Sequence, residues 1–302
     1  MEKGYQLHRG ESLGESLCRI CAWQTERTAK IFRDETMSME ERVHEARKRI
    51  KETRALLRLF RGALGDTFDD ENRRFRDAGR ELAPYRDATT VVEAIKALSP
   101  RVRETVGAKA MRALRTFANE RQQAQFAGES ALRERFESLI ARFAGANERL
   151  ARASLPDTTR FSIIEDGLAR TISTGRRAMA SAFKSGTDAD FHEWRKRVKD
   201  LGHHIELLIN VWPKVMTTME QEISTLAQHL GHHHDLALVA EVVHQTEGTL
   251  GDAAERHRIG RLIAAQQKRI VALARPIAER VYAVRPRRMA RAVGTLWDVW
   301  RA

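Results

Sequence analysis

The chain contains the same basic, helix-forming segment twice. Residues 43–60 read VHEARKRIKETRALLRLF and residues 191–208 read FHEWRKRVKDLGHHIELL, at a constant offset of 148 residues. The register continues without a gap, so that Leu82 falls on Leu230. Self-similarity at a fixed offset is typical of a duplicated structural unit. The chain is therefore expected to fold into two related halves.

Composition and periodicity predict that both halves are helical. Charged residues make up 31% of the 302 positions and aromatic residues only 6%, and no sustained alternation of apolar and polar residues marks a strand. A linker at 155–159 is expected to separate a first half, residues 10–153, from a second half, residues 160–302, packed as one domain over residues 10–302. Helices are expected over about 12–33, 38–62, 68–83, 87–98, 101–122, 128–152, 161–184, 189–210, 214–230, 235–246, 253–274 and 277–301, with Pro286 breaking or kinking the last.

The repeated segments place most of their basic side chains on one helical face. At 3.6 residues per turn, this stripe consists of His44, Arg47, Lys48, Lys51, Arg54 and Arg58 in the first copy and of His192, Arg195, Lys196, Lys199 and His203 in the second. A solvated face usually mixes charge signs at i,i+4, because like charges at that spacing destabilise the helix. A nearly acid-free stripe in both halves therefore favours an anion-binding surface over a merely solvated one.

The stripe also predicts which arginines matter. Reversing Arg47 and Arg195 to Glu is expected to abolish anion binding with little change in melting temperature, because neither residue lies on the apolar face. Arg49 and Arg197 lie about 140° around the helix from the histidine of each copy. Reversing these two is expected to have little effect.

The charge balance and the cysteines narrow the class of protein. A net charge of +12 predicts polyanionic partners, namely nucleic acid, an anionic membrane or a phosphate polymer. Cys18 and Cys21 are the only cysteines, and an i,i+3 pair is expected to be buried thiols rather than part of a four-ligand zinc site. No stretch reaches the roughly 18 apolar residues of a membrane span, and residues 1–10 do not resemble a secretory signal. A cytoplasmic protein without a membrane partner is expected.

The segment Gly-His-His-His-Asp at 231–235 suggests a metal site, but consecutive helical side chains point about 100° apart and cannot converge on one ion. His234-Asp235 is similar to the His-Asp pair of metal-dependent phosphohydrolases, yet residues 84–87 of the first half read Pro-Tyr-Arg-Asp. The shared Asp87 and Asp235 are expected to cap a helix start or, alternatively, to hold a stripe arginine. We find no catalytic constellation, metal site or cofactor motif, so an enzyme is not expected.

The chemistry of the stripe favours phosphate. Arginine binds phosphate oxygens bidentately and lysine binds them as a point charge. His44 and His192 are expected to donate hydrogen bonds as neutral imidazoles, since nearby cations disfavour their charged form. Single-stranded nucleic acid is also held by stacking aromatic side chains, and neither stripe contains Tyr or Phe. A phosphate polymer is thus favoured; the alternatives are a nucleic-acid-binding helical protein and an HD-like metal-dependent phosphohydrolase.

Two motifs recur with the same spacing. The pattern H-x-x-R-x-x-x-[KR] occurs as His44-Arg47-Lys51 and as His192-Arg195-Lys199. It is followed by LAPYRD at 82–87 and by LGHHHD at 230–235, both similar to Leu-Gly-x-x-[RN]-Asp. With these motifs the chain resembles the conserved-histidine α-helical domain family, CHAD, over about residues 10–300.

The resemblance implies an all-α fold of two pseudo-symmetric, four-helix-bundle-like halves whose basic helices face a central cleft or pore that binds inorganic polyphosphate. Members commonly accompany polyphosphate granules, which implies a cytoplasmic location on such granules. Some members are fused to a CYTH triphosphate-tunnel domain, for which this chain has no room, so a non-catalytic binding or storage role is expected. Other polyanions are expected to bind at low salt. Additional contributors to the site are Arg19, Arg27 and Arg86.

Overall fold

The computed structural model describes residues 3–98, 103–104, 106–153, 155, 159–245 and 253–302. The first half contains η1 (Lys3–Tyr5), α1 (Leu13–Arg33), α2 (Met39–Leu59), α3 (Arg61–Leu64), α4 (Asp66–Glu81), α5 (Ala83–Ala97), α7 (Ala108–Phe126), α8 (Glu129–Ala144) and α9 (Ala146–Arg152). The second half contains α10 (Ser162–Ser185), α11 (Asp188–Leu207), η2 (Ile209–Val211), α12 (Pro213–Gln245), α13 (Ala253–Val281) and α14 (Pro286–Arg301). No strand occurs among the described residues, and the all-α prediction is confirmed.

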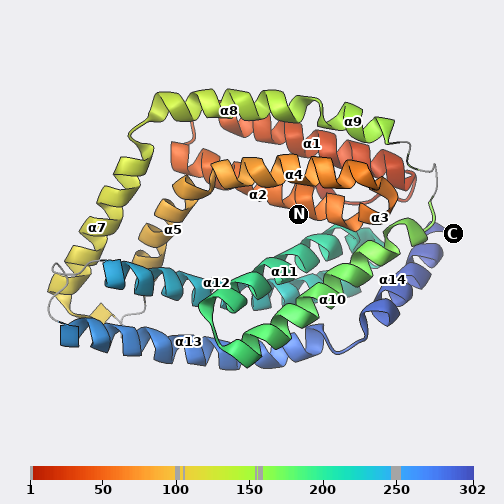
Figure 1. The fold of residues 1–302 in the computed structure, drawn as a ribbon. Coiled ribbons are helices and arrows are strands. Elements are labelled where there is room, and N and C mark those ends of the chain that lie inside the picture. The colour runs from red at the N-terminus through yellow and green to blue at the C-terminus, as the bar shows by residue number, and fades with distance from the viewer. Residues whose placement is uncertain (1–2, 99–102, 105, 154, 156–158, 246–252) are drawn as a thin grey trace.

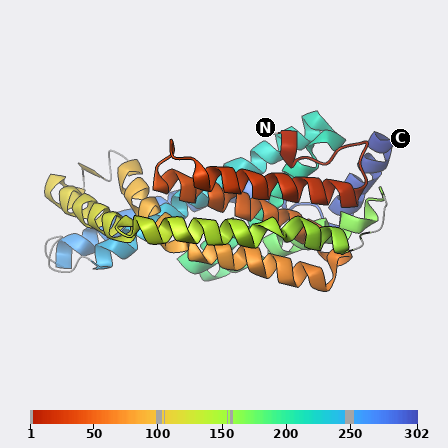
Figure 2. The same cartoon turned by 90° about the horizontal axis from the view of Figure 1, so that it is seen from above.

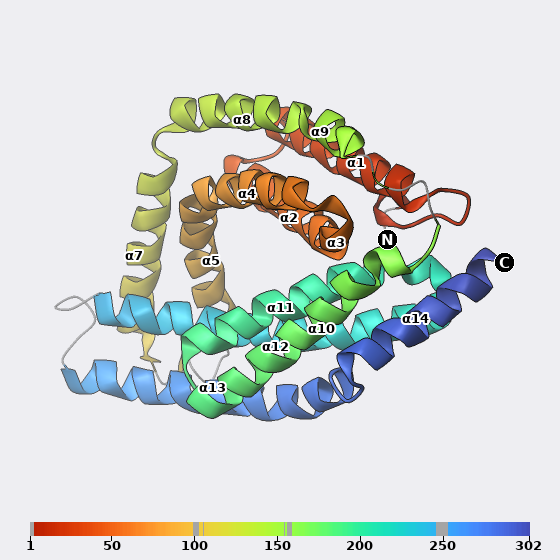
Figure 3. The same cartoon turned by 45° about the vertical axis from the view of Figure 1, so that its right-hand side comes forward.

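The helices form two layers, and the helices α5 and α7 connect the layers at one end (Figure 1). Helices α1, α2, α4 and α8 lie in one layer and α10 to α14 in the other, with α2 packed directly against α10 and α11 (Figure 3). Helices α5 and α7 pack on each other and run steeply from the first layer to the far part of α12. Seen from above, this pair lies together with the ends of α12 and α13 in an extension at one end of the molecule (Figure 2).

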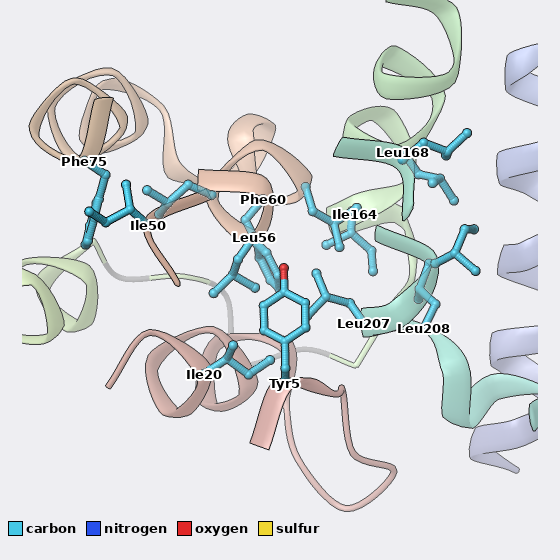
Figure 4. Packing of buried hydrophobic residues seen from close by; sticks show 14 of the residues in the cluster. Tyr5, Ile20, Ile50, Leu56, Phe60, Phe75, Ile164, Leu168, Leu207 and Leu208 are labelled. Carbon is cyan, nitrogen blue, oxygen red and sulfur yellow. The ribbon is translucent and has the colours of Figure 1, made fainter. Parts of the chain in front are cut away.

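One hydrophobic core runs through both layers at the crossing of α2 and α10. Leu56 and Phe60 lie beside Ile164 of α10, and all three side chains are buried (Figure 4). The two helices approach so closely because Gly167 has no side chain: a Cβ there would lie 2.0 Å from the carbonyl oxygen of Leu59. The crossing therefore fixes the stripe-bearing helix α2 against the second half of the chain.

A second, smaller core lies between α5 and α7 and the helices α12 and α13. Val91 of α5 and Leu114 of α7 are buried together with Val239 of α12 and Ile263 of α13. Because this cluster joins elements from both halves, it anchors α5 on the second layer. Arg86, in the first turn of α5, is thereby held near the helices that carry the stripes.

Local sequence signals determine where the stripe helices begin. At the start of α2 the hydroxyl of Ser38 accepts a hydrogen bond from the Glu41 backbone N–H at 3.2 Å, and the Glu41 carboxylate accepts one from the Ser38 N–H at 2.8 Å. This capping box satisfies two backbone donors that the helix itself leaves without partners. At the start of α11 the Thr187 hydroxyl caps the Asp190 N–H.

The equivalent helix of the two halves is broken in one and continuous in the other. The sequence predicted separate helices at 214–230 and 235–246, whereas the structure has a single helix, α12. In the first half the same stretch is divided into α4 and α5 at Leu82, two residues before Pro84. Proline lacks the N–H that an unbroken helix needs and clashes with the preceding turn. The aligned residue His232 has neither restriction, so α12 continues.

The last helices also differ from the prediction. Helix α13 passes through Pro276 and ends at Val281. The predicted break at Pro286 is confirmed: Pro286 starts a separate helix, α14, as suits a residue whose missing N–H costs nothing in the first turn. Helix α7 begins at Ala108, and residues 103, 104 and 106 before it are also helical; residues 99–102 and 105, which include the predicted start at 101, lie outside the described part of the chain. The core of the predicted linker, residues 156–158, also lies outside it.

Candidate functional site

The middle of the two basic stripes comes together in the structure. Burial lowers the pKa of the Lys51 ammonium to about 7, and the next causes are Arg47 on its own helix and then Lys199 and Arg195 on α11. The same effects, burial first and Arg195 next, lower the pKa of Lys199 to about 8. Lys51 nevertheless has a solvent-exposed side chain. The Lys51 side chain therefore reaches solvent, although the surrounding protein removes much of the water from its ammonium group.

Arg86 of α5 joins the two stripes. Its positive charge contributes to the lowered pKa of Lys51 in the first half and of Lys199 and Arg195 in the second, after burial in each case. Its own guanidinium forms an ion pair with Glu93 at 2.8 Å. We call the five residues that interact in this way the central cluster: Arg47, Lys51, Arg86, Arg195 and Lys199.

The arginines of the central cluster have buried N–H groups without acceptors. Within the described residues, the Nε atoms of Arg47 and Arg195 and Nη1 of Arg86 are buried and have no hydrogen-bond partner. Leaving a buried donor of a charged group unsatisfied costs more than about 1–3 kcal/mol. Three such donors, from α2, α5 and α11, at a point where cations repel one another, make the central cluster a candidate anion-binding site.

Each stripe arginine has a carboxylate partner at the equivalent place in its half. Asp87 favours the charged form of Arg47, and Asp235 favours that of Arg195, although burial lowers the pKa of both guanidinium groups. The prediction that these aspartates cap helix starts is wrong, since Asp87 is the fifth residue of α5 and Asp235 lies inside α12. Their electrostatic effect agrees with the alternative, a carboxylate that holds a stripe arginine.

The break between α4 and α5 gives Arg47 a further contact. The guanidinium Nη1 of Arg47 donates a hydrogen bond to the backbone carbonyl of Gly79. Gly79 lies in the last turn of α4, where carbonyls have no partner within the helix. The broken helix thus positions the stripe arginine of the first half. In the second half Arg195 lies across Gly231, whose Cβ, if present, would be 3.7 Å from its Nε.

The histidines of the two halves have different neighbours. Burial and then the charge of Arg86 lower the pKa of His44. In the second half Nδ1 of His192 lies 3.2 Å from Nδ1 of His234, so that one ring donates a hydrogen bond to the other. Burial, followed by the charges of His192 and Arg195, lowers the pKa of His234 to about 3. Both histidines of this pair are therefore neutral imidazoles at physiological pH.

The three consecutive histidines of α12 point in different directions. His232 is exposed, His233 packs on the ring of Phe191 at 4.4 Å between centroids, and His234 contacts His192. Among the described residues, no group of three His, Cys, Asp or Glu side chains could hold a metal ion. The pair of His234 and Asp235 therefore lacks, within that part of the chain, the further ligands of a phosphohydrolase centre.

The outer end of the stripes differs from the sequence prediction. Arg58 forms an ion pair with Asp200 of α11 at 2.7 Å, and Nε of Arg54 donates to Asn72 at 3.2 Å. His203 does not join the cations: its ring meets Tyr5 edge-on at 6.2 Å between centroids, and it lies 3.7 Å from Glu206. Burial raises the pKa of Glu52, and the nearby His203 opposes that rise. His203 thus lies on the stripe face of α11 but beyond its cationic part, in an acidic neighbourhood.

The remaining predicted contributors lie at the edge of the site or away from it. Lys48 is exposed, and Lys196 is exposed and paired with Glu193. On α1, Arg19 binds the Glu11 carboxylate and the carbonyls of two residues near the N-terminus, and Arg27 lies over the Trp23 ring at 5.6 Å. Arg86, expected only as an additional contributor, is the residue that links the two stripes.

Arg49 is not the neutral surface position that helical geometry suggested. It is 3% exposed and forms an ion pair with Glu52 at 3.0 Å, and Gln24 of α1 donates to the same carboxylate at 2.9 Å. The helical wheel placed Arg49 opposite the stripe correctly, but that side of α2 faces α1 and not solvent. Reversing its charge would leave like charges buried together, so the structure leads us to expect a loss of stability from this reversal instead of little effect.

The comparisons with known proteins identify the family. The profile of the CHAD domain matches residues 19–244, about three quarters of the chain, and the chain belongs to the CHAD domain family. Its fold is similar to that in "Crystal structure of the CHAD domain from the plant Ricinus communis", with a TM-score of 0.65 and 16% sequence identity. The match covers 92% of this chain and 95% of the plant domain. No curated protein matches the chain.

Proposed function

We propose that this protein binds inorganic polyphosphate along a basic channel between α2 and α11, with the central cluster as its main contact. The observation that carries the proposal is the set of unsatisfied arginine donors on three elements, in a cluster where cations depress one another's pKa values. Membership of the CHAD family supports a polyphosphate-associated role. The protein acts in this proposal as a binding or granule-associated component and not as a hydrolase.

The composition of the cluster favours a polymer of phosphate over nucleic acid. Its contacts are guanidinium and ammonium groups, and the aromatic residue nearest to the second stripe in sequence, Trp194, is fully buried. Sequence-tolerant binding of single strands depends on aromatic side chains that stack on bases. A linear polyanion without bases needs only closely spaced donors, which five cations from three helices provide.

Calorimetric titration with long-chain polyphosphate at 50 mM and 200 mM salt tests the proposal. Affinity is expected to fall by at least about tenfold between the two, since each neutralised phosphate releases a counterion. Single-stranded DNA at equal phosphate concentration is expected not to displace the polymer. Displacement would favour the nucleic-acid alternative. Phosphate release with Mg²⁺ or Mn²⁺ that is lost in Asp235→Ala would favour the phosphohydrolase.

No binding of polyphosphate at either salt concentration would contradict the proposal outright. Comparing three ligands in the same titration also tests whether net charge alone explains the binding. Binding that is equally tight for tripolyphosphate, long chains and DNA would reflect the net charge of +12 and not a built site.

A further inference from the structure

A second group of arginines lies beyond the central cluster, and a carboxylate of the protein sits among them. Asp200 of α11 binds Nη1 of Arg58 at 2.7 Å through one oxygen and faces Nη1 of Arg197 at 3.5 Å through the other. Arg54 lies close to the same group: after burial, the charge of Arg58 is the main cause that lowers its pKa, to about 10, and Asp200 opposes the shift. We call Arg54, Arg58 and Arg197 the outer cluster.

The outer cluster continues the line of the stripe. Arg54 and Arg58 follow Arg47 and Lys51 on the same face of α2, and Lys51 and Arg58 are separated by about 10 Å at a rise of 1.5 Å per residue. A polyanion lying along α2 from the central cluster therefore reaches the guanidinium of Arg58 after several phosphoryl units. At that point it meets Asp200, a negative charge in its path.

The contact of Asp200 with the outer cluster belongs to one half only. The aligned residue of the first half, Glu52, is fully occupied inside the core by Arg49 and by Gln24 of α1. Asp200 instead reaches across from α11 to α2 and remains partly accessible, with 14% of its side chain exposed. It is thus an acidic side chain whose partners are stripe residues.

We propose that the outer cluster is a second phosphate subsite and that Asp200 occupies it when no ligand is bound. This inference rests on the proposed function. Carboxylate and phosphate oxygens accept the same paired guanidinium hydrogen bonds. A chain that extends past the central cluster takes over Arg58, and Asp200 keeps Arg197, which lies three residues away on its own helix. Asp200 thereby weakens the binding of long chains and leaves the affinity for short chains unchanged.

The test is a titration of Asp200→Asn with tripolyphosphate and with long-chain polyphosphate. The variant is expected to bind the long chain about tenfold more tightly, the equivalent of one freed charge-assisted contact, and to bind tripolyphosphate as the wild type does. Glu222→Gln is the control. It removes the same charge from α12, where Glu222 pairs with Arg280 of α13 and with no residue of either cluster. It is expected to change either affinity less than twofold.

Equal gains in the two variants, or equal gains for both ligands, would mean that Asp200 acts only through net charge and would overturn the inference. An unchanged or weakened long-chain affinity in folded Asp200→Asn, judged by circular dichroism, would assign Asp200 a merely structural role. If that variant does not fold, Arg58→Gln decides the question. It is expected to weaken long-chain binding only, and an effect on neither ligand would exclude an outer subsite.

The two claims fail separately. A wild-type protein that binds neither tripolyphosphate nor the long chain contradicts the proposed function itself. A wild-type protein that binds both, with variants that do not distinguish them by chain length, leaves the proposed function in place and removes only the outer subsite.

Discussion

The two halves contribute the same core of the site but different surroundings. Both contain an Arg and a Lys in the central cluster and an aspartate behind the arginine. The second repeated motif reads LAPYRD at 82–87 and LGHHHD at 230–235. The residue before its aspartate, however, is Arg86 in the first half and His234 in the second. Arg86 is always charged, whereas His234 is neutral and bound to His192. The two halves thus share an arginine, a lysine and an aspartate at aligned positions but differ in permanent charge.

Backbone structure differs between the halves at the same place. Pro84 breaks the first-half helix and frees the Gly79 carbonyl for Arg47, whereas α12 runs unbroken past Arg195. The arginine of the first half is held by a hydrogen bond to a backbone carbonyl, whereas the arginine of the second half lies close to Gly231. The comparison teaches that two arginines at aligned positions, both proposed to contact the ligand, are positioned by different means, and this difference is open to experiment.

Charge reversal of the stripe arginines should have the largest effect. Arg47→Glu combined with Arg195→Glu is expected to abolish polyphosphate binding, because it places two acids where donors are needed. Contrary to the expectation from sequence, stability should also fall, and more for Arg47→Glu alone than for Arg195→Glu. The former leaves the Gly79 carbonyl without its donor, at a cost of about 1–3 kcal/mol. Urea unfolding of the single variants measures the difference; equal losses would contradict the positional argument.

Exchanging the differing residues tests the unequal division of charge. Arg86→His is expected to weaken polyphosphate binding about tenfold, since a charge-assisted contact shared by both stripes is lost. His234→Arg should strengthen binding by a smaller factor, because its neighbours in the cluster are already cationic. The double exchange should return the affinity toward that of the wild type. Calorimetry of the three variants checks this, and a neutral Arg86→His would remove Arg86 from the site.

The lysines make binding depend on pH, by about tenfold per pH unit near pH 8. In the free protein Lys51, with a pKa of about 7, is largely neutral at pH 8, and Lys199, with a pKa of about 8, is half charged. A polyanion restores their charge, so affinity should rise as the pH falls from 9 to 6. Binding at pH 8 should take up about one proton. Titrations in buffers of different ionisation enthalpy count the protons, and proton release would contradict the crowding of the cluster.

The same shifts affect stability with a definite sign. Both lysines have folded-state pKa values below the ordinary 10.5, so between about pH 7 and pH 10.5 the unfolded chain binds more protons than the folded one. The free energy of unfolding should therefore rise with pH through this window as far as these two residues contribute. Denaturation curves of the ligand-free protein at several pH values would show the contribution, which should be absent once both lysines are replaced by glutamine.

The sequence alone predicted the fold class and the centre of the candidate site. Amphipathic repeats determine which face of a helix is basic, so Arg47 and Arg195 could be placed on one stripe from their spacing. They do not determine what lies opposite each turn. Arg49 is buried because α1 covers its side of α2, and His203 faces acids brought by other elements.

Residues that act through tertiary contacts were the hardest to predict. Arg58 has the positive charge and the helical position of a stripe residue, but only the packing of α11 on α2 brings Asp200 close to it. Arg86 is four residues into a helix of its own, and its role follows from the crossing of α5 over both layers. The sequence did contain a signal for Arg86: it lies in the second of the two repeated motifs, at the position where the other half has His234.

The central claim is that a built cluster, not the overall charge, binds polyphosphate. Lys51→Gln combined with Lys199→Gln tests it most directly, against Lys30→Gln combined with Lys268→Gln, which removes the same charge from exposed positions on α1 and α13. The cluster pair is expected to bind long-chain polyphosphate about a hundredfold more weakly, as two charge-assisted contacts are lost, and to melt no lower than the wild type, since crowded charges are removed. The control pair should bind within about twofold of the wild type, because screening leaves distant exposed charges little influence. Equal losses in the two pairs would contradict the account.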